Sequence, residues 1–451
     1  MFSSNENYQQ SVDKSTVRIS DPSMISSQFS SMKLSDVSSS GFDLVVPGHD
    51  AEFDIIDSLD YDDVDTGLFD QEIMHQRREG FVQELHQTET MYVSILQLVE
   101  DLYLLPLRKN AKQSTFSFLG NKKSPITERE KAWLFCNIDD VLNVHKEILK
   151  SLKERLNIWG PTQILSDVIL TWFPKIQKVY HIYLDNYSTM TSTFERLGRY
   201  QPFKKFSESA EKNLEKGTTL LDLLRAPVTC IVRYTKLLTA LADSTATMHP
   251  DYTGLMQCKQ RVQGLLEEFR PRVVDARNVD QVYEIHTCMA DRPFGIRAER
   301  RLYLQDNFFQ INKTSVEDRA YFLFSDMLVF AKRKSSSSLL YKGHIILERA
   351  KVRLLSKEEA TGENHCIEII SSFQGVDSLN TTFMASPTAH IMKTSSENEQ
   401  LKWKYYLESI VAKIDQMAMQ QKVNGGKLTP PNSVRRPGTS LSNESTSSVT
   451  L

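Results

Sequence analysis

The chain carries none of the short motifs through which proteins usually perform covalent or metal-assisted chemistry. We find no G-x-x-x-x-G-K-[ST] phosphate loop, no H-E-x-x-H zinc motif, no G-x-S-x-G nucleophile and no dinucleotide-binding glycine pattern. No pair of carboxylates lies in a context that indicates acid–base work. The five cysteines are scattered without C-x-x-C spacing, which favours reduced thiols over a disulfide framework or a zinc site. We therefore expect no catalytic residues, no metal and no cofactor.

Two charged residues instead lie beside strongly helical apolar patterns. Glu89 is one residue past an apolar stripe with a spacing of three and four, at its border. Arg233 lies in the apolar stretch 220–245, where Pro227 predicts a kink or a helix start. The stripe that Glu89 borders consists of Phe81, Leu85, Thr88, Tyr92, Ile95, Val99 and Leu102. On pattern alone, either charge is typical of a solvated helix surface.

The sequences around these charges resemble the Dbl-homology family, whose members exchange guanine nucleotide on Rho-family GTPases. ELHQTETMYV, around Glu89, resembles the opening block EL-x-x-TE-x-x-YV. APVTCIVRYTKLL, around Arg233, resembles the block PVQR-x-x-(R/K)Y-x-LLL. Further likenesses are the stretch ending at His145, within a helix expected over 128–156, the aromatic stripe 173–187 and the HPDY turn at 249–252. The resemblance covers about 78–292 and implies an all-helical bundle. We expect His145 to pack or hydrogen-bond and not to bind metal.

The resemblance also implies which residues meet the GTPase. In the family the glutamate of TE engages switch I, and a cation on a neighbouring helix holds switch II; these positions are Glu89 and Arg233. Thr229 stands where the family usually has glutamine, and Arg270 stands where an ungapped count places a partner-facing asparagine. Two alternatives remain open. The chain is an exchange factor for a Rho, Rac or Cdc-type GTPase that regulates actin, or a catalytically silent scaffold for lipid or protein partners.

The pattern changes after residue 300 to short β-branched and aromatic runs, in which Ser325–Asp326 predicts a hairpin. A helix follows, with Trp403, Leu407, Ile410, Val411 and Ile414 on one face. This arrangement resembles a pleckstrin-homology domain, a β-sandwich or barrel capped by a C-terminal helix.

A basic cluster is expected after one strand of this domain, formed by Lys332, Arg333 and Lys334. Each cation near an anionic surface contributes about 1 kcal/mol, so we expect weak binding to anionic phospholipid. A solvated loop is the alternative.

Composition sets the remaining expectations. The net charge of −3 over 451 residues gives no basic field for nucleic acid. No apolar run is long enough to span a membrane and no signal peptide is visible, so we expect a cytoplasmic protein, at most peripheral at a membrane or the cytoskeleton. The acidic segment 41–75 is either a linker or folds back on the basic loop 108–126. The expected regions are a disordered Ser-rich, then acidic, N-terminus (1–75), the helical domain (76–292, with a connector at 201–217), a linker (293–299), the β domain (300–416) and a disordered tail (417–451).

Overall fold

A computed structural model describes residues 62–109, 124–290, 292–312, 315–335, 338–374 and 383–423. Most of the acidic segment, the middle of the basic loop and the tail beyond 423 lie outside these ranges. Within them, no helix is long and apolar enough to cross a membrane.

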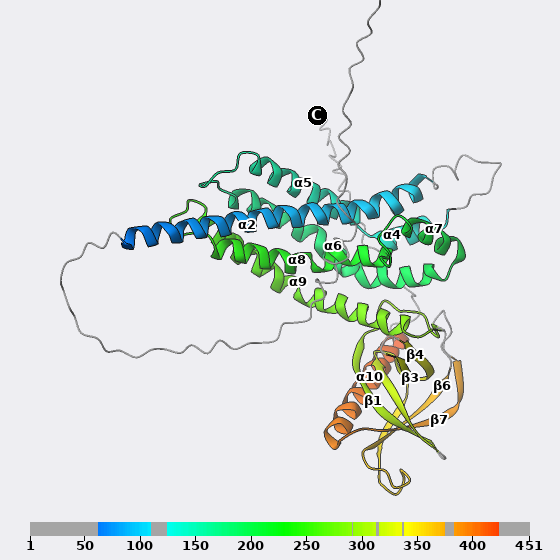
Figure 1. Ribbon diagram of the computed structural model, residues 1–451. Helices are drawn as coiled ribbons and strands as arrows, with labels where there is room; N and C mark the ends of the chain where they lie inside the picture. Colours follow the sequence, from blue (N-terminus) through cyan, green and yellow to red (C-terminus); the bar gives the residue numbers. More distant parts are fainter. Residues whose placement is uncertain are drawn as a thin grey trace, which may run out of the picture.

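The first half is a helical bundle around one apolar core, as expected. Helix α8 packs between α2 and α9, and the three run side by side (Figure 1). Helix α5 packs on α2, and α6 packs on both α5 and α9, which completes the bundle. The elements are α2 (Asp62–Val99), the π-helical turn η1 (Glu100–Leu104), α4 (Glu128–Phe135), α5 (Ile138–Leu156), α6 (Ser166–Gly198), α7 (Gln201–Glu211), α8 (Leu220–Asp243) and α9 (Tyr252–Thr287).

Helix α8 begins where its first backbone N–H groups find side-chain acceptors. Thr219 and Asp222 form a capping box, in which each side chain accepts a hydrogen bond from the other residue's backbone N–H. The prediction of a helix start at Pro227 is therefore wrong, because the proline lies inside the helix, seven residues after its first residue. The buried stripe of α8 runs unbroken through it.

Three other elements differ from the sequence expectation. Helix α2 begins at Asp62, so residues 62–75, expected to be disordered, are helical; acidic side chains near a helix N-terminus are favoured by the helix dipole. The expected connector contains α7, whose Pro202 lies in the first turn, where proline is tolerated. The single helix expected over 128–156 is broken at Cys136, whose φ of 47° ends α4.

The second half is a seven-stranded antiparallel sheet closed by a helix, as expected (Figure 1). The strand order is β4-β3-β2-β1-β7-β6-β5. The predicted hairpin at Ser325–Asp326 is confirmed, since β2 and β3 pair on either side of it. The strands are β1 (Leu302–Ile311), β2 (Val316–Phe324), β3 (Met327–Ser335), β4 (Ser338–Ile346), β5 (Lys351–Leu355), β6 (Cys366–Gln374) and β7 (Phe383–Lys393).

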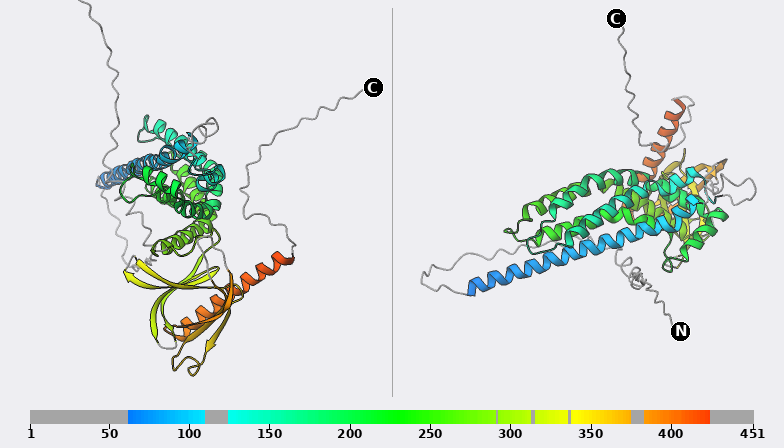
Figure 2. Two further views of the ribbon diagram at one scale, coloured as in Figure 1. Left: turned by 90° about the vertical axis from the view of Figure 1, so that its right-hand side faces the viewer. Right: turned by 90° about the horizontal axis from the view of Figure 1, so that it is seen from above.

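Helix α10 (Glu397–Val423) closes this domain, so residues 417–423, expected to belong to the disordered tail, are helical. Its Trp403, Leu407 and Ile410 are buried in the core of the sheet, as the sequence predicts. Figure 2 shows the C-terminal end of α10 extending past the strands.

The two halves are joined by packed residues. Near its C-terminal end, α9 contributes Val282 and Ile285 to a core that it shares with strands β2 to β4. In the expected linker 293–299, Phe294 is buried in the same core. The side chain of Asn278 on α9 exchanges two hydrogen bonds with the backbone of Leu302, at the start of β1. The sheet is therefore held to α9 by a shared core and by backbone contacts.

Candidate functional site

Glu89 lies inside the bundle and not at its border. The residue is 1% exposed. One carboxylate oxygen, Oε1, is 2.8 Å from Nδ1 of His145 on α5, and the other, Oε2, accepts a hydrogen bond from the Tyr234 hydroxyl on α8. The expected border position is wrong because Glu89 shares a face of α2 with the buried Leu85 and Leu96, so the buried stripe is wider than its apolar residues indicate.

The carboxylate belongs to a larger set of buried polar groups, which we call the Glu89 network: Glu89, Tyr92, His145, Tyr180 and Tyr234. His145 Nε2 is 2.9 Å from the Tyr180 hydroxyl, which is 2.7 Å from that of Tyr92. The members come from α2, α5, α6 and α8, so the network joins four helices. The expected hydrogen bond of His145 is confirmed, and no group of potential metal ligands occurs in the described ranges.

Electrostatics favours an ionised pair at the centre of this network. Burial opposes the charged form of His145, but the adjacent Glu89 carboxylate and the Cys230 sulfur together outweigh it and raise the pKa of the imidazole to about 10. The histidine is then a cation at neutral pH and donates hydrogen bonds from both ring nitrogens, to Glu89 and to Tyr180. Burial raises the pKa of the Tyr234 hydroxyl, so this group keeps its proton and donates it to Glu89.

Arg233 lies directly above this network, on the outward side of α8. Its guanidinium carbon is 5.4 Å from the centroid of the Tyr92 ring, a cation–π distance. Its Nη2 donates a long hydrogen bond, 3.4 Å, to the Thr229 hydroxyl one turn earlier. Consecutive helical residues point about 100° apart, so the neighbouring Tyr234 points inward while Arg233 stays half-buried at the surface. The structure thus brings Glu89, Thr229 and Arg233 together.

Arg270 is on the adjacent helix α9, where it is exposed and pairs with Glu267 three residues earlier. Helix α9 runs beside α8, and α8 beside α2 (Figure 1); we call the exposed surface of these three helices the three-helix face.

The basic cluster of the sheet domain lies within a strand, and its expected position after the strand is wrong. Lys332, Arg333 and Lys334 are residues of β3, and all three are exposed. Lys332 is opposite Leu340 and Arg333 opposite Leu339 on β4. Side chains on both faces of β3 are exposed here, whereas Leu339 on the paired strand β4 is buried in the core shared with α9.

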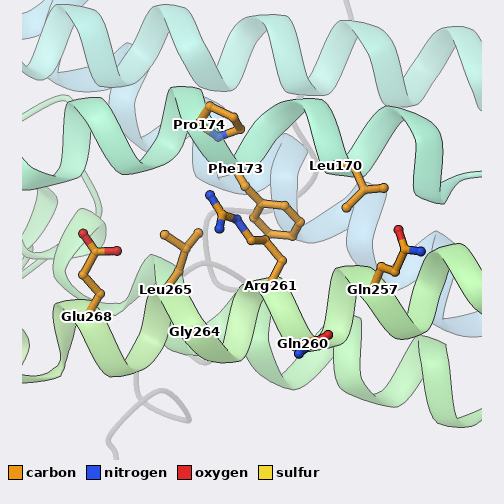
Figure 3. Close-up of a pocket in the computed structure, with 9 residues that line it drawn as sticks. All are labelled: Leu170, Phe173, Pro174, Gln257, Gln260, Arg261, Gly264, Leu265 and Glu268. Atoms are coloured by element: carbon orange, nitrogen blue, oxygen red, sulfur yellow. The ribbon is translucent and has the colours of Figure 1, made fainter.

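A groove of about 780 Å³ lies on the other side of α9, between that helix and α6 (Figure 3). Its apolar lining is Leu170, Phe173, Pro174 and Leu265, and its polar lining is Gln257, Gln260, Arg261 and Glu268. Gly264 also lines the groove, and a Cβ added there would meet no atom within 4 Å. Glu268 and Arg270 are two residues apart on one helix and point in nearly opposite directions, so the groove and Arg270 lie on opposite sides of α9.

Comparison with known proteins identifies the two halves. Residues 81–270 match the RhoGEF domain family, and residues 296–410 match the family of SOS1/NGEF-like PH domains. The chain carries a RhoGEF (Dbl-homology) domain followed by a PH domain. Glu89, Thr229, Arg233 and Arg270 all fall within the RhoGEF match, and the β3 cluster falls within the PH match.

Curated relatives of this RhoGEF–PH unit include exchange factors. "Rac guanine nucleotide exchange factor B" of Dictyostelium discoideum is 25% identical over 291 residues, which cover 58% of this chain and 24% of the relative. "Phosphatidylinositol 3,4,5-trisphosphate-dependent Rac exchanger 1 protein" of Mus musculus is 28% identical over 274 residues, 59% of this chain and 16% of the relative. The chain thus spans a quarter or less of the length of these proteins.

Among solved structures, the DH/PH domains of p115-RhoGEF align with a TM-score of 0.44 at 16% identity, over 75% of this chain and 94% of that one. This alignment adds nothing to the fold described above.

Sequence reasoning did not assemble the Glu89 network of this RhoGEF domain. The sequence places Tyr92 in an apolar stripe and Tyr180 in an aromatic one, and it indicates no partner for His145. The available signal was the spacing of Glu89 and Tyr92, three residues apart on a helix and hence on one face. A carboxylate on such a face needs buried donors opposite it, and a histidine and tyrosines on the facing helices can supply them.

Proposed function

We propose that this chain is a guanine nucleotide exchange factor for a Rho-family GTPase. The observation that carries the proposal is the RhoGEF match over 81–270, which spans the packed helices α2, α8 and α9 and the outward-facing Arg233. The GTPase would bind across the three-helix face, with Arg233 on switch II and Glu89 on switch I. The curated relatives are named as exchange factors for Rac, so a Rac-type GTPase is the first candidate partner.

Exchange needs no covalent step. A partner that binds the nucleotide-free GTPase better than the loaded one must weaken nucleotide binding by the same factor, by thermodynamic linkage. Such a partner needs a rigid surface, and groups on packed helices are placed more accurately than groups on loops. Arg233 meets this requirement, because it stacks on Tyr92 and contacts Thr229.

We also propose that the PH domain brings this protein from the cytoplasm to anionic membrane through Lys332, Arg333 and Lys334. Their exposure at one end of the β3–β4 hairpin supports this role. Sedimentation of the full chain with vesicles of neutral phospholipid, with and without anionic phospholipid, tests it at low and moderate salt. We expect binding that requires anionic lipid and weakens with salt; binding independent of lipid charge would contradict it.

The exchange proposal is tested by nucleotide release. The full chain is mixed with Rho, Rac and Cdc-type GTPases loaded with fluorescent GDP, and the release rate is measured against the GTPase alone. We expect acceleration on at least one GTPase, and a loss of that acceleration in Arg233→Ala. The matched control is Arg261→Ala, an exposed arginine of the α6–α9 groove, which should keep the wild-type rate.

A second candidate is a catalytically silent scaffold with the same fold. The burial of Glu89 favours it, since a carboxylate whose two oxygens are both engaged inside the bundle is not presented to a partner. A chain that binds a GTPase or vesicles but accelerates release from no GTPase of the panel is this scaffold.

A further inference from the structure

Glu89 is buried, so its carboxylate can contact a GTPase only after a conformational change. We propose that His145 and Tyr234 form a latch that holds the Glu89 carboxylate inside the bundle, and that GTPase binding requires its release. This inference rests on the proposed exchange function.

The geometry of the carboxylate supports the latch. Oε1 is engaged by the His145 imidazole at 2.8 Å and Oε2 by the Tyr234 hydroxyl, and the two partners come from different helices, α5 and α8. Glu89 is 1% exposed and His145 is fully buried. To reach a partner, the carboxylate must break both interactions.

Arg233 contacts the outer side of the same network. Its guanidinium covers the Tyr92 ring, and the Tyr92 hydroxyl continues through Tyr180 to His145. A GTPase that draws Arg233 away from Tyr92 removes a cation from the outer side of the network. The groups implied to meet the two switches, Arg233 and Glu89, are therefore linked through three buried side chains.

The latch has a quantitative consequence for exchange. If only a fraction of the molecules presents Glu89 outward, the apparent dissociation constant for the GTPase is the intrinsic value divided by that fraction. A change that weakens the inward state without touching the outward one raises this fraction. It lowers the GTPase concentration needed for half-maximal exchange and leaves the maximal rate unchanged.

Two tyrosine-to-phenylalanine variants separate the latch from general stability. Tyr234→Phe removes the hydroxyl that donates to Glu89, whereas Tyr180→Phe removes a hydroxyl that contacts only His145 and Tyr92 in the network. Both positions are buried, and both variants lose one hydroxyl from the same network. We expect Tyr234→Phe to lower the half-saturating GTPase concentration about tenfold, the effect of one hydrogen bond to a charged group, and Tyr180→Phe to change it less than twofold.

The outcomes separate this inference from the proposed function. A wild-type chain that neither binds nor exchanges any Rho-family GTPase overturns both. An active wild type with equal half-saturating concentrations for the two variants overturns the latch alone.

A second measurement covers the case in which Tyr234→Phe does not fold. The ¹⁵N signals of the His145 imidazole are recorded in the wild-type full chain, before and after saturation with nucleotide-free GTPase. Loss of the Glu89 partner should shift the Nδ1 signal. An unchanged signal in the saturated complex overturns the latch.

Discussion

Two carboxylate–histidine pairs of the RhoGEF domain lie in opposite environments. Glu89 and His145 are almost fully buried beneath α8, at 2.8 Å, while Glu268 and His181 meet at 2.5 Å beside the α6–α9 groove with about a third of each side chain exposed. Although burial lowers the pKa of His145, Glu89 and Cys230 together raise it to about 10. Glu268, which accepts hydrogen bonds from Gln177 and His181, has a pKa below its usual value. The same pair of residue types therefore joins four helices inside the bundle and lies at the surface beside the groove.

The largest expected difference between the two pairs is in stability. His145→Gln leaves the Glu89 carboxylate buried without a counter-charge, and breaking a buried pair in this way costs about 3–5 kcal/mol. His181→Gln breaks an exposed pair, which is worth about 0–1 kcal/mol. Urea unfolding of the full chain gives both free energies of unfolding. Equal losses would mean that burial does not distinguish the two pairs.

The exchange rate should also depend more on the buried Glu89 than on the exposed Glu268. Glu89→Ala removes the charge-assisted contact that we propose with the GTPase, worth about 1.5–3 kcal/mol, so the rate should fall by at most about tenfold to a hundredfold. The loss is an upper bound because the variant no longer has to release the latch. Glu268→Ala is the control and should keep the wild-type rate, since Glu268 faces the groove. Normal exchange by a folded Glu89→Ala protein would remove Glu89 from the GTPase-binding residues.

The buried pair also predicts how stability depends on pH. The pKa of His145 is raised from 6.5 to about 10 in the folded state, so its stabilising effect is fully present below pH 6.5 and is lost as the pH rises through 10. The free energy of unfolding should fall in this interval by up to about 1.4 kcal/mol per pH unit. The measurement is the difference between wild type and His145→Gln, which removes the contributions of other groups. A pH-independent difference between pH 7 and 10 would show that the buried histidine is neutral.

Much of the fold could be predicted from the sequence, because apolar periodicity reports directly which face of a helix or strand is buried. Such patterns predict the helices of the RhoGEF domain and the strands of the PH domain. They also predict the hairpin at Ser325–Asp326 and the buried face of α10. The start of α2 was missed because acidic residues 62–75 carry little apolar signal, and α7 because its few buried residues lie among polar ones.

The site was only half predictable for a related reason. Local sequence identifies Glu89 and Arg233, but it cannot tell whether a carboxylate beside an apolar stripe faces water or a buried cation. That depends on His145 and Tyr234, which lie 56 and 145 residues away in the sequence. The PH cluster was misplaced because β3 continues through three consecutive basic residues, whose exposure resembles that of a loop.

The smallest expected effect tests whether the groove region is as open as its geometry indicates. Glycine in a helix interior is about 1 kcal/mol less favourable than alanine, unless the added methyl group meets other atoms. A Cβ at Gly264 in the groove, or at Gly80 on α2, would meet nothing within 4 Å. Both Gly264→Ala and Gly80→Ala should therefore raise the free energy of unfolding by about 1 kcal/mol. If only Gly80→Ala stabilises the protein, the methyl group at position 264 meets atoms in solution, and the groove between α6 and α9 is closed there.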